Sequence, residues 1–419
     1  MPFGTDPETN DAEIKRLIAL LGSTQDETTR ILAAESLGEI ATGNTEAIAV
    51  LIQLLDSTQN EETRSIAARS LGYIASGNTE AIAALIKLLG STQNEGTRLL
   101  TARSLGYIGS ENTKAIAALI QLLGSTHDKQ IRLQAVESLG EIAPGNTSAI
   151  AALIQLLGST HDKQIRLSAA ESLETIGTSN SEAIRGLIGL LDNTQNEPTR
   201  SQAAESLGYI ANGNEDAIAA LIQLLNSAQN NSISSIAARS LGYIASGNAD
   251  AIAALIQLLS KAQDETTRSI AAESLGYIAT DNSEAIGVLI QLLSRTQDEE
   301  TRLLAAESLG YIASGNPEAI RVLIQLLDST RDKYTRKQAA RSLEKIGTGN
   351  AEAITALIEL LNNSDSYAVR RQSVEILKKI GIGNLKAIEE LRTLGHTTES
   401  AYIRHLTTEI LEDIDSGGD

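Results

Sequence analysis

The fold is decided by residues 44–77, which read NTEAIAVLIQLLDSTQNEETRSIAARSLGYIASG. In the first half of this stretch, Ala47, Ile48 and Leu51 recur at helical spacing rather than in alternation. A polar turn follows, and the second half again spaces its apolar residues for one face of a helix. The stretch therefore predicts two short helices that run antiparallel.

The predicted helix ends carry residues suited to capping. Asn44 precedes the first helix and Asn60 the second, and an Asn at an N-cap accepts a hydrogen bond from a first-turn amide that has no other partner. Gly77 closes the unit, where a left-handed C-cap favours glycine. These residues place the boundaries of both helices.

The unit recurs along the chain with a step of 34 residues and no insertion. An asparagine stands at the position of Asn44 in every repeat, and these residues are Asn10, Asn44, Asn78, Asn112, Asn146, Asn180, Asn214, Asn248, Asn282, Asn316, Asn350 and Asn384. Because one helix pair is too small to bury its own apolar faces, stacking must bury them. The sequence predicts an all-α fold, an α-solenoid of twelve 34-residue helix-pair repeats over residues 10–415. The more polar first and last repeats are expected to be caps, and residues 1–9 and 416–419 disordered tails.

Composition narrows the class of protein. The chain has 419 residues, only five Pro and no Cys, which excludes disulfides and thiolate chemistry. Residues 1–10 lack an apolar signal region, and no apolar run is long enough to span a membrane, so we expect a soluble, cytoplasmic protein. The net charge of −19 disfavours nucleic acid as a partner.

Residues 292–312, which read LLSRTQDEETRLLAAESLGYI, resemble the HEAT repeat. The resemblance is to short bacterial HEAT repeats of the kind found in phycobilisome-lyase-like proteins and in sensor arrays of bacterial nucleotide-binding signalling proteins. It implies a HEAT-like, armadillo-like superhelix. Tetratricopeptide repeats share the 34-residue period, but the chain has no Trp, and its one Phe, Phe3, lies outside the array.

The resemblance also implies a role for a column of arginines, which in HEAT proteins bond to turn residues of neighbouring repeats. This structural ladder is expected at Arg30, Arg64, Arg98, Arg132, Arg166, Arg200, Arg268, Arg302, Arg336, Arg370 and Arg404. Phosphate binding is the alternative role for these side chains. The seventh repeat carries Ser234 instead, which predicts a softer joint there.

A candidate partner-binding stripe lies on the second helices, which line the concave surface of HEAT-like stacks. Helical geometry places three sets of equivalent positions, those of residues 66, 69 and 73 and their counterparts in other repeats, opposite the buried face. The stripe contains Tyr73, Tyr107, Tyr209, Tyr243, Tyr277, Tyr311, Ile236, Ile270, Leu304, Arg239, Glu273 and Glu307. Tyr and Arg are enriched at binding hot spots. Two interpretations stay open: a partner surface, or tyrosines that cover the backbone of the neighbouring helix.

Signs of catalysis are lacking in the sequence. It contains no P-loop, metalloprotease or nucleophile-elbow motif, and His127 and His161 occupy equivalent turns that we interpret as copied surface turns rather than a metal site. We therefore expect no enzyme activity, no cofactor and no metal. The leading hypothesis is a protein–protein interaction scaffold whose partner sits along the concave surface. The alternatives are a phycobilisome-lyase-like helper in chromophore attachment and the sensor array of a bacterial nucleotide-binding signalling protein.

Overall fold

The computed structural model describes residues 7–228 and 230–416, and this part of the chain forms twenty-four helices and no strand. The chain divides into two compact units, Met1–Ile210 and Ala211–Asp419. The first unit contains α1 (Pro7–Ser23), α2 (Glu27–Ile40), α3 (Thr45–Ser57), α4 (Glu61–Ile74), α5 (Thr79–Ser91), α6 (Glu95–Ile108), α7 (Thr113–Ser125), α8 (Lys129–Ile142), α9 (Thr147–Ser159), α10 (Lys163–Ile176), α11 (Ser181–Asn193) and α12 (Glu197–Ile210). The second contains α13 (Glu215–Ser227), α14 (Asn231–Ile244), α15 (Ala249–Lys261), α16 (Glu265–Ile278), α17 (Ser283–Arg295), α18 (Glu299–Ile312), α19 (Pro317–Ser329), α20 (Lys333–Ile346), α21 (Ala351–Asn363), α22 (Tyr367–Ile380), α23 (Leu385–Thr397) and α24 (Ala401–Ser416).

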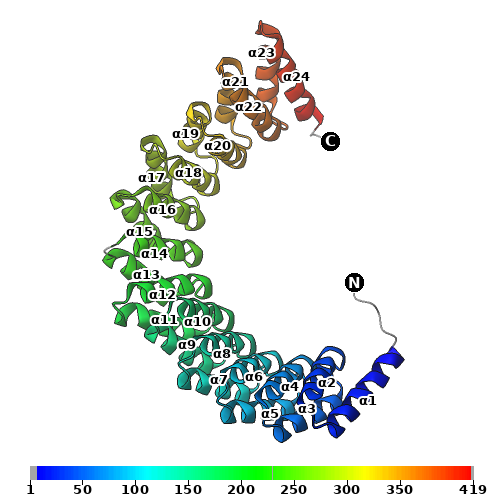
Figure 1. The fold of residues 1–419 in the computed structure, drawn as a ribbon. Coiled ribbons are helices and arrows are strands. Elements are labelled where there is room, and N and C mark those ends of the chain that lie inside the picture. Colours follow the sequence, from blue (N-terminus) through cyan, green and yellow to red (C-terminus); the bar gives the residue numbers. More distant parts are fainter. Residues whose placement is uncertain (1–6, 229, 417–419) are drawn as a thin grey trace. The chain divides into compact units, whose positions relative to one another are not determined.

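Within each unit the helices alternate between two layers (Figure 1). Odd-numbered helices, which begin the repeats, stack on one side, and even-numbered helices stack on the other. Within a unit, each helix packs against its partner in the repeat and against the same helix of the adjacent repeat. This is the helix-pair solenoid that the 34-residue step predicts.

The asparagine column sets the start of the odd-numbered helices. Asn44 has an extended backbone, and its Oδ1 accepts a hydrogen bond from the Ala47 amide at 2.9 Å. Asn60 caps α4 in the same way, through the Thr63 amide. The first repeat differs, because α1 already begins at Pro7 and Asn10 lies inside it. Asn10 is therefore no N-cap, and its Nδ2 donates instead to the Ile40 carbonyl at 3.3 Å.

The tight turn that ends each repeat also joins it to the next one. Gly77 adopts a φ of 68°, and its amide donates to the Ile108 carbonyl of the following repeat at 3.1 Å. A positive φ is strained for residues that carry a Cβ. Glu111 nevertheless adopts a φ of 57°, and its amide bonds to the Ile142 carbonyl at 2.8 Å. The bond to the next helix thus holds this conformation even without glycine.

Close packing of the even-numbered helices depends on a second glycine column. A Cβ added to Gly72 of α4 would lie 2.7 Å from Ser104 Oγ and 2.9 Å from Ser104 Cβ of α6. Ala67, Ala68 and Leu71 on the same helix have no exposed surface. Contact at this distance requires glycine at position 72 as well as the small alanines.

The ends of the chain are helical for longer than the sequence suggests. Helix α1 starts three residues before the predicted solenoid boundary, and α24 continues to Ser416. The rest of the predicted tails, residues 1–6 and 417–419, lies outside the described residues. In the last repeat Arg392 is exposed, but Thr407, which replaces an alanine, is buried and donates to the Arg404 carbonyl at 2.8 Å.

Candidate interaction surface

The tyrosine column lies on the even-numbered helices, one turn or less from each C-terminus. All six rings are about half exposed, from 47% at Tyr243 to 56% at Tyr209. Neighbouring rings lie against each other within a unit. The ring centroids of Tyr73 and Tyr107 are 6.1 Å apart, and those of Tyr277 are 6.4 Å from both Tyr243 and Tyr311. We call these six residues the tyrosine ladder.

Two ladder hydroxyls in the second unit, those of Tyr277 and Tyr311, are held by acids of the same helices. Tyr277 Oη donates to Glu273 Oε1 at 3.1 Å, and Tyr311 Oη donates to Glu307 Oε1 at 3.2 Å. Burial and the adjacent Glu273 carboxylate raise the pKa of Tyr277 to about 12. Since the ionised form is disfavoured, the hydroxyls stay protonated. Lys345 Nζ lies 3.8 Å from the centroid of the Tyr311 ring, an attractive cation–π contact.

The aliphatic members of the predicted stripe are less available than expected. Ile236 and Leu304 are half-buried, and Ile270 is buried with 7% of its surface exposed. The prediction that Ile270 contacts a partner is therefore wrong. The other members of its column, such as Ile236 and Leu304, keep part of their surface exposed. Arg239 is exposed, whereas Glu273 is half-buried beneath its tyrosine.

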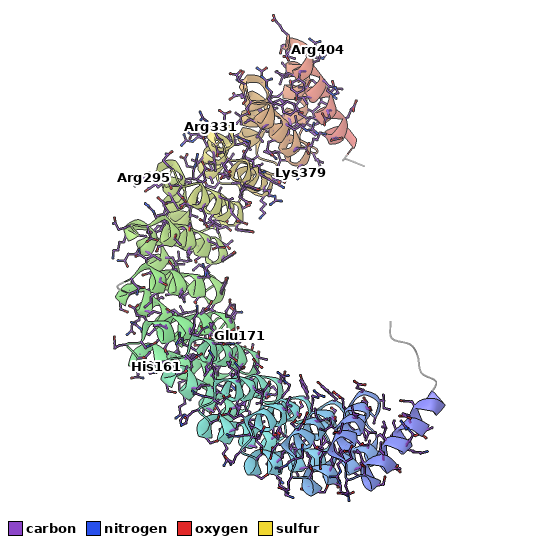
Figure 2. All side chains as sticks on the ribbon, in the orientation of Figure 1. His161, Glu171, Arg295, Arg331, Lys379 and Arg404 are labelled. Atoms are coloured by element: carbon purple, nitrogen blue, oxygen red, sulfur yellow. The ribbon has the colours of Figure 1, made fainter. Side chains whose placement is uncertain are left out.

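Charged residues flank the ladder in the first unit. Arg69 Nη2 lies 2.6 Å from Glu35 Oε1 of the preceding repeat, and Arg103 Nε donates to Gln134 Oε1 at 2.9 Å. Burial raises the pKa of Glu141, and the Glu137 charge adds to this rise. Figure 2 shows Glu171 of α10 on the even-numbered side of its unit.

Glu174 replaces the glycine of the Leu-Gly-Tyr motif in α10. Burial raises the pKa of its carboxyl, as do the nearby Glu205 and Glu171 charges, while a 2.8 Å hydrogen bond from Ser206 Oγ lowers it. Glu137 and Glu141 of α8 are both exposed.

The arginine column stabilises turns, but mostly within its own repeat. Arg30 donates to the Thr24 carbonyl at 3.0 Å and pairs with Glu27 at 2.9 Å. Arg302 pairs with Glu299 in the same way. The predicted bond to a neighbouring repeat occurs at Arg64, whose Nη2 is 3.4 Å from Ser91 Oγ. The arginine side chain points back over the start of its own helix. The prediction that these arginines bond to neighbouring repeats is therefore largely wrong.

Glutamates make the connection that was assigned to the arginines. Glu61 accepts hydrogen bonds from Thr92 Oγ1 at 2.9 Å and Thr97 Oγ1 at 2.7 Å, both in the next repeat, while Arg64 holds its other oxygen. Glu27, Glu265 and Glu299 occupy equivalent positions and accept from threonines of the following repeat. The sequence did contain a signal for this contact, because threonines recur 31 and 36 residues after Glu61 and its equivalents.

Nothing in the described part of the chain has the form of a catalytic or metal centre. No group of three or more metal-ligating side chains occurs among the described residues. His127 and His161 are exposed in their turns. The helices described here include none with the length and apolar character needed to cross a bilayer.

Comparison with known proteins gives a consistent fold. The family model described as HEAT repeats matches residues 14–106, 82–174, 184–276, 252–344, 286–373 and 320–412. No curated protein sequence matches the chain.

Several solved karyopherin structures share the fold. Kap121p bound to Nup53p has a TM-score of 0.67 and 17% identity, and the match covers 98% of this chain and 49% of Kap121p. Kap121p bound to the extreme C-terminus of the protein phosphatase Cdc14p has a TM-score of 0.64 and 14% identity over 99% of this chain and 51% of that one. Kap95p, described with RanGDP, has a TM-score of 0.59 and 14% identity over 99% of this chain and 65% of Kap95p.

This chain thus spans about half the length of Kap121p. At such identities the likeness concerns the fold. Because the HEAT model matches residues 14–174 and 184–412 and the helices pair at the same period, the chain belongs to the HEAT-repeat family.

Proposed function

We propose that this chain is a non-catalytic scaffold that binds a partner protein along the even-numbered helices. The observation that carries the proposal is the tyrosine ladder. Its rings are about half exposed and occupy the same position in six repeats. Tyr73 lies against Tyr107, and Tyr277 lies against both Tyr243 and Tyr311. Tyrosine offers large, rigid contact area with little entropy to lose on binding.

The fold supports the same function. HEAT solenoids present extended surfaces built from repeated helices, and the related structures include karyopherins described with bound proteins. Those partners belong to the karyopherins. For this chain the partner class is protein, and the second unit, where Tyr243, Tyr277 and Tyr311 follow one another, is the proposed centre of contact.

The test compares two triple variants of the full chain as baits in cell lysate. Replacing Tyr243, Tyr277 and Tyr311 with alanine should remove proteins that the unaltered chain captures. The matched control replaces Gln257, Gln291 and Gln325 with alanine. These three residues are exposed on the odd-numbered helices. Equal capture by the tyrosine variant and the unaltered chain would remove the basis of the proposal.

A further inference from the structure

We propose that the pocket around Arg132 is a binding site for an oxyanion, a phosphate or carboxylate group, and that the pocket around Arg98 is a second copy. The Arg132 pocket is a cavity of about 450 Å³ between repeats four and five. The end of α7 with its turn forms one wall, and α9 forms the other. This site lies away from the tyrosine ladder and is independent of the proposed partner surface.

The guanidinium of Arg132 has no carboxylate to neutralise it. In six other repeats the residue three positions before the arginine is a glutamate, as in the Arg302–Glu299 pair at 2.9 Å. At this place the chain has Lys129, whose Nζ is engaged with Asp162 Oδ2 at 3.0 Å. Arg132 Nε is buried and has no hydrogen-bond partner among the described residues, and the same holds for Arg302 Nε, so the missing ion pair is what distinguishes Arg132. A buried donor without a partner costs free energy that a ligand can recover.

The volume of each pocket can be compared with the presence or absence of an ion pair at its arginine. Around Arg302, which is paired with Glu299, the equivalent cavity measures about 140 Å³. Around Arg98, which forms no ion pair with any described residue, it measures about 310 Å³. Of these three pockets, the two larger ones are those whose arginine forms no ion pair with any described residue.

The lining of the Arg132 pocket suits an oxyanion. The guanidinium fork can donate two parallel hydrogen bonds to a carboxylate or a phosphate. Thr126, His127, Gln155 and Ser159 surround it with polar groups, and Ile120 and Leu123 complete the wall.

The carboxylates nearest in sequence are already engaged. Asp128 accepts from the Ile131 amide at 2.8 Å, and Asp162 accepts from the Gln164 and Ile165 amides as well as from Lys129. An incoming anion therefore meets a cation that these acids do not satisfy.

The experiment follows the Nε–Hε signals of individual arginines by NMR while sodium phosphate or sodium acetate is added to the full chain. Sodium chloride keeps the ionic strength constant. We expect the Arg132 and Arg98 signals to shift saturably and the Arg302 signal to stay in place. Saturation by phosphate alone, by acetate alone or by both identifies the oxyanion. An Arg132 signal that does not move, or that moves equally with chloride, overturns the proposal.

A variant separates binding from structure. Lys129→Glu restores the glutamate found in other repeats, so it should occupy Arg132 and abolish the saturable Arg132 shift without loss of helical circular dichroism. The Arg98 shift should persist in this variant, as an internal control. Arg132→Gln should weaken anion binding at this pocket by about tenfold or more. If Lys129→Glu binds the anion at Arg132 as the unaltered chain does, the assignment is wrong.

Discussion

Single carboxylates connect the repeats of this protein. Glu27 accepts hydrogen bonds from Thr58 and Thr63 of the next repeat while Arg30 pairs with the same carboxylate. A hydrogen bond to a charged group contributes more than one between neutral groups. Each glutamate of this kind therefore fixes the spacing between two turns, and its side chain is positioned by an arginine from its own repeat.

Acid should weaken this contact at Glu27. The Thr63 hydroxyl, more than any other group, lowers the pKa of Glu27 below its ordinary value of 4.5. A carboxyl with a depressed folded pKa adds stability that is complete above the unfolded value and is lost as the pH falls through the folded value. Glu27→Gln should therefore flatten the pH dependence of the unfolding free energy below about pH 4.5.

Urea denaturation of both proteins at a series of pH values measures this effect. Glu46→Gln, in the exposed first turn of α3, is the control and should retain the full pH dependence. Parallel curves for Glu27→Gln and the unaltered chain would show that the threonine contacts do not stabilise the ionised form.

The distance between neighbouring even-numbered helices depends on the residue at one position, that of Gly72 and its equivalents. Where α4 meets α6, Gly72 faces Ser104. In α10 the same position holds Glu174, and in α20 it holds Glu344, so those helices cannot approach the next one in the same way. A single substitution in this column thus changes how two helices pack.

Gly72→Ala should destabilise the first unit by about 1–3 kcal/mol, because its Cβ would meet Ser104 Oγ at 2.7 Å and the helices must separate. The control is Gly90→Ala in α5, where a Cβ would meet no atom within 4 Å. That change should be neutral or stabilise by up to about 1 kcal/mol, through helix propensity. Chemical denaturation measures both, and equal effects would contradict the close-packing argument.

We expect the seventh repeat to have a weaker start of its second helix, α14, than the eighth repeat has at α16. Ser234 replaces the ladder arginine, Asn231 replaces the glutamate, and a cavity of about 230 Å³ remains beside them. We expect amide hydrogens in the first turn of α14 to exchange about tenfold faster than those of α16, which retains Arg268 and Glu265. Hydrogen exchange measured by mass spectrometry tests this, and equal protection would refute the softer joint.

Filling that cavity should reverse the effect. Asn231→Glu combined with Ser234→Arg restores the pair seen at Glu265 and Arg268. The variant should slow exchange in α14 toward the rate of α16 and leave α18 unchanged.

Across the whole molecule, stability is distributed over contacts between adjacent repeats. Within each unit, each helix packs on its repeat partner and on the equivalent helix of an adjacent repeat. In such arrays stability is a sum of repeat and nearest-neighbour terms, and cooperativity weakens with length. The chain also forms two compact units, Met1–Ile210 and Ala211–Asp419.

Unfolding of the full chain should accordingly deviate from a single two-state transition. Hydrogen exchange in increasing urea should show the helices of repeat seven opening at lower denaturant than those of repeat two, where Glu61 bridges to the next turn. One midpoint shared by every helix would contradict distributed stability.

Local patterns were enough to predict the repeat, the helix caps and the exposed tyrosines. Asn44 and Asn60 cap because their side chains reach amides three residues away, and Tyr73 is exposed because helical geometry places it opposite Leu71. Such properties depend on neighbours within one helix, so the order of residues determines them.

Only the tertiary structure decided which side chains meet across repeats. It turned Ile270 into the contact between helices, gave the threonine contacts to Glu61 rather than to Arg64, and left Arg132 without a carboxylate beside an open pocket. These outcomes depend on the distance and rotation between helices from different repeats. A shift of about one ångström in that packing changes which hydrogen-bond donor reaches which acceptor, because hydrogen bonds act over a narrow range of distances.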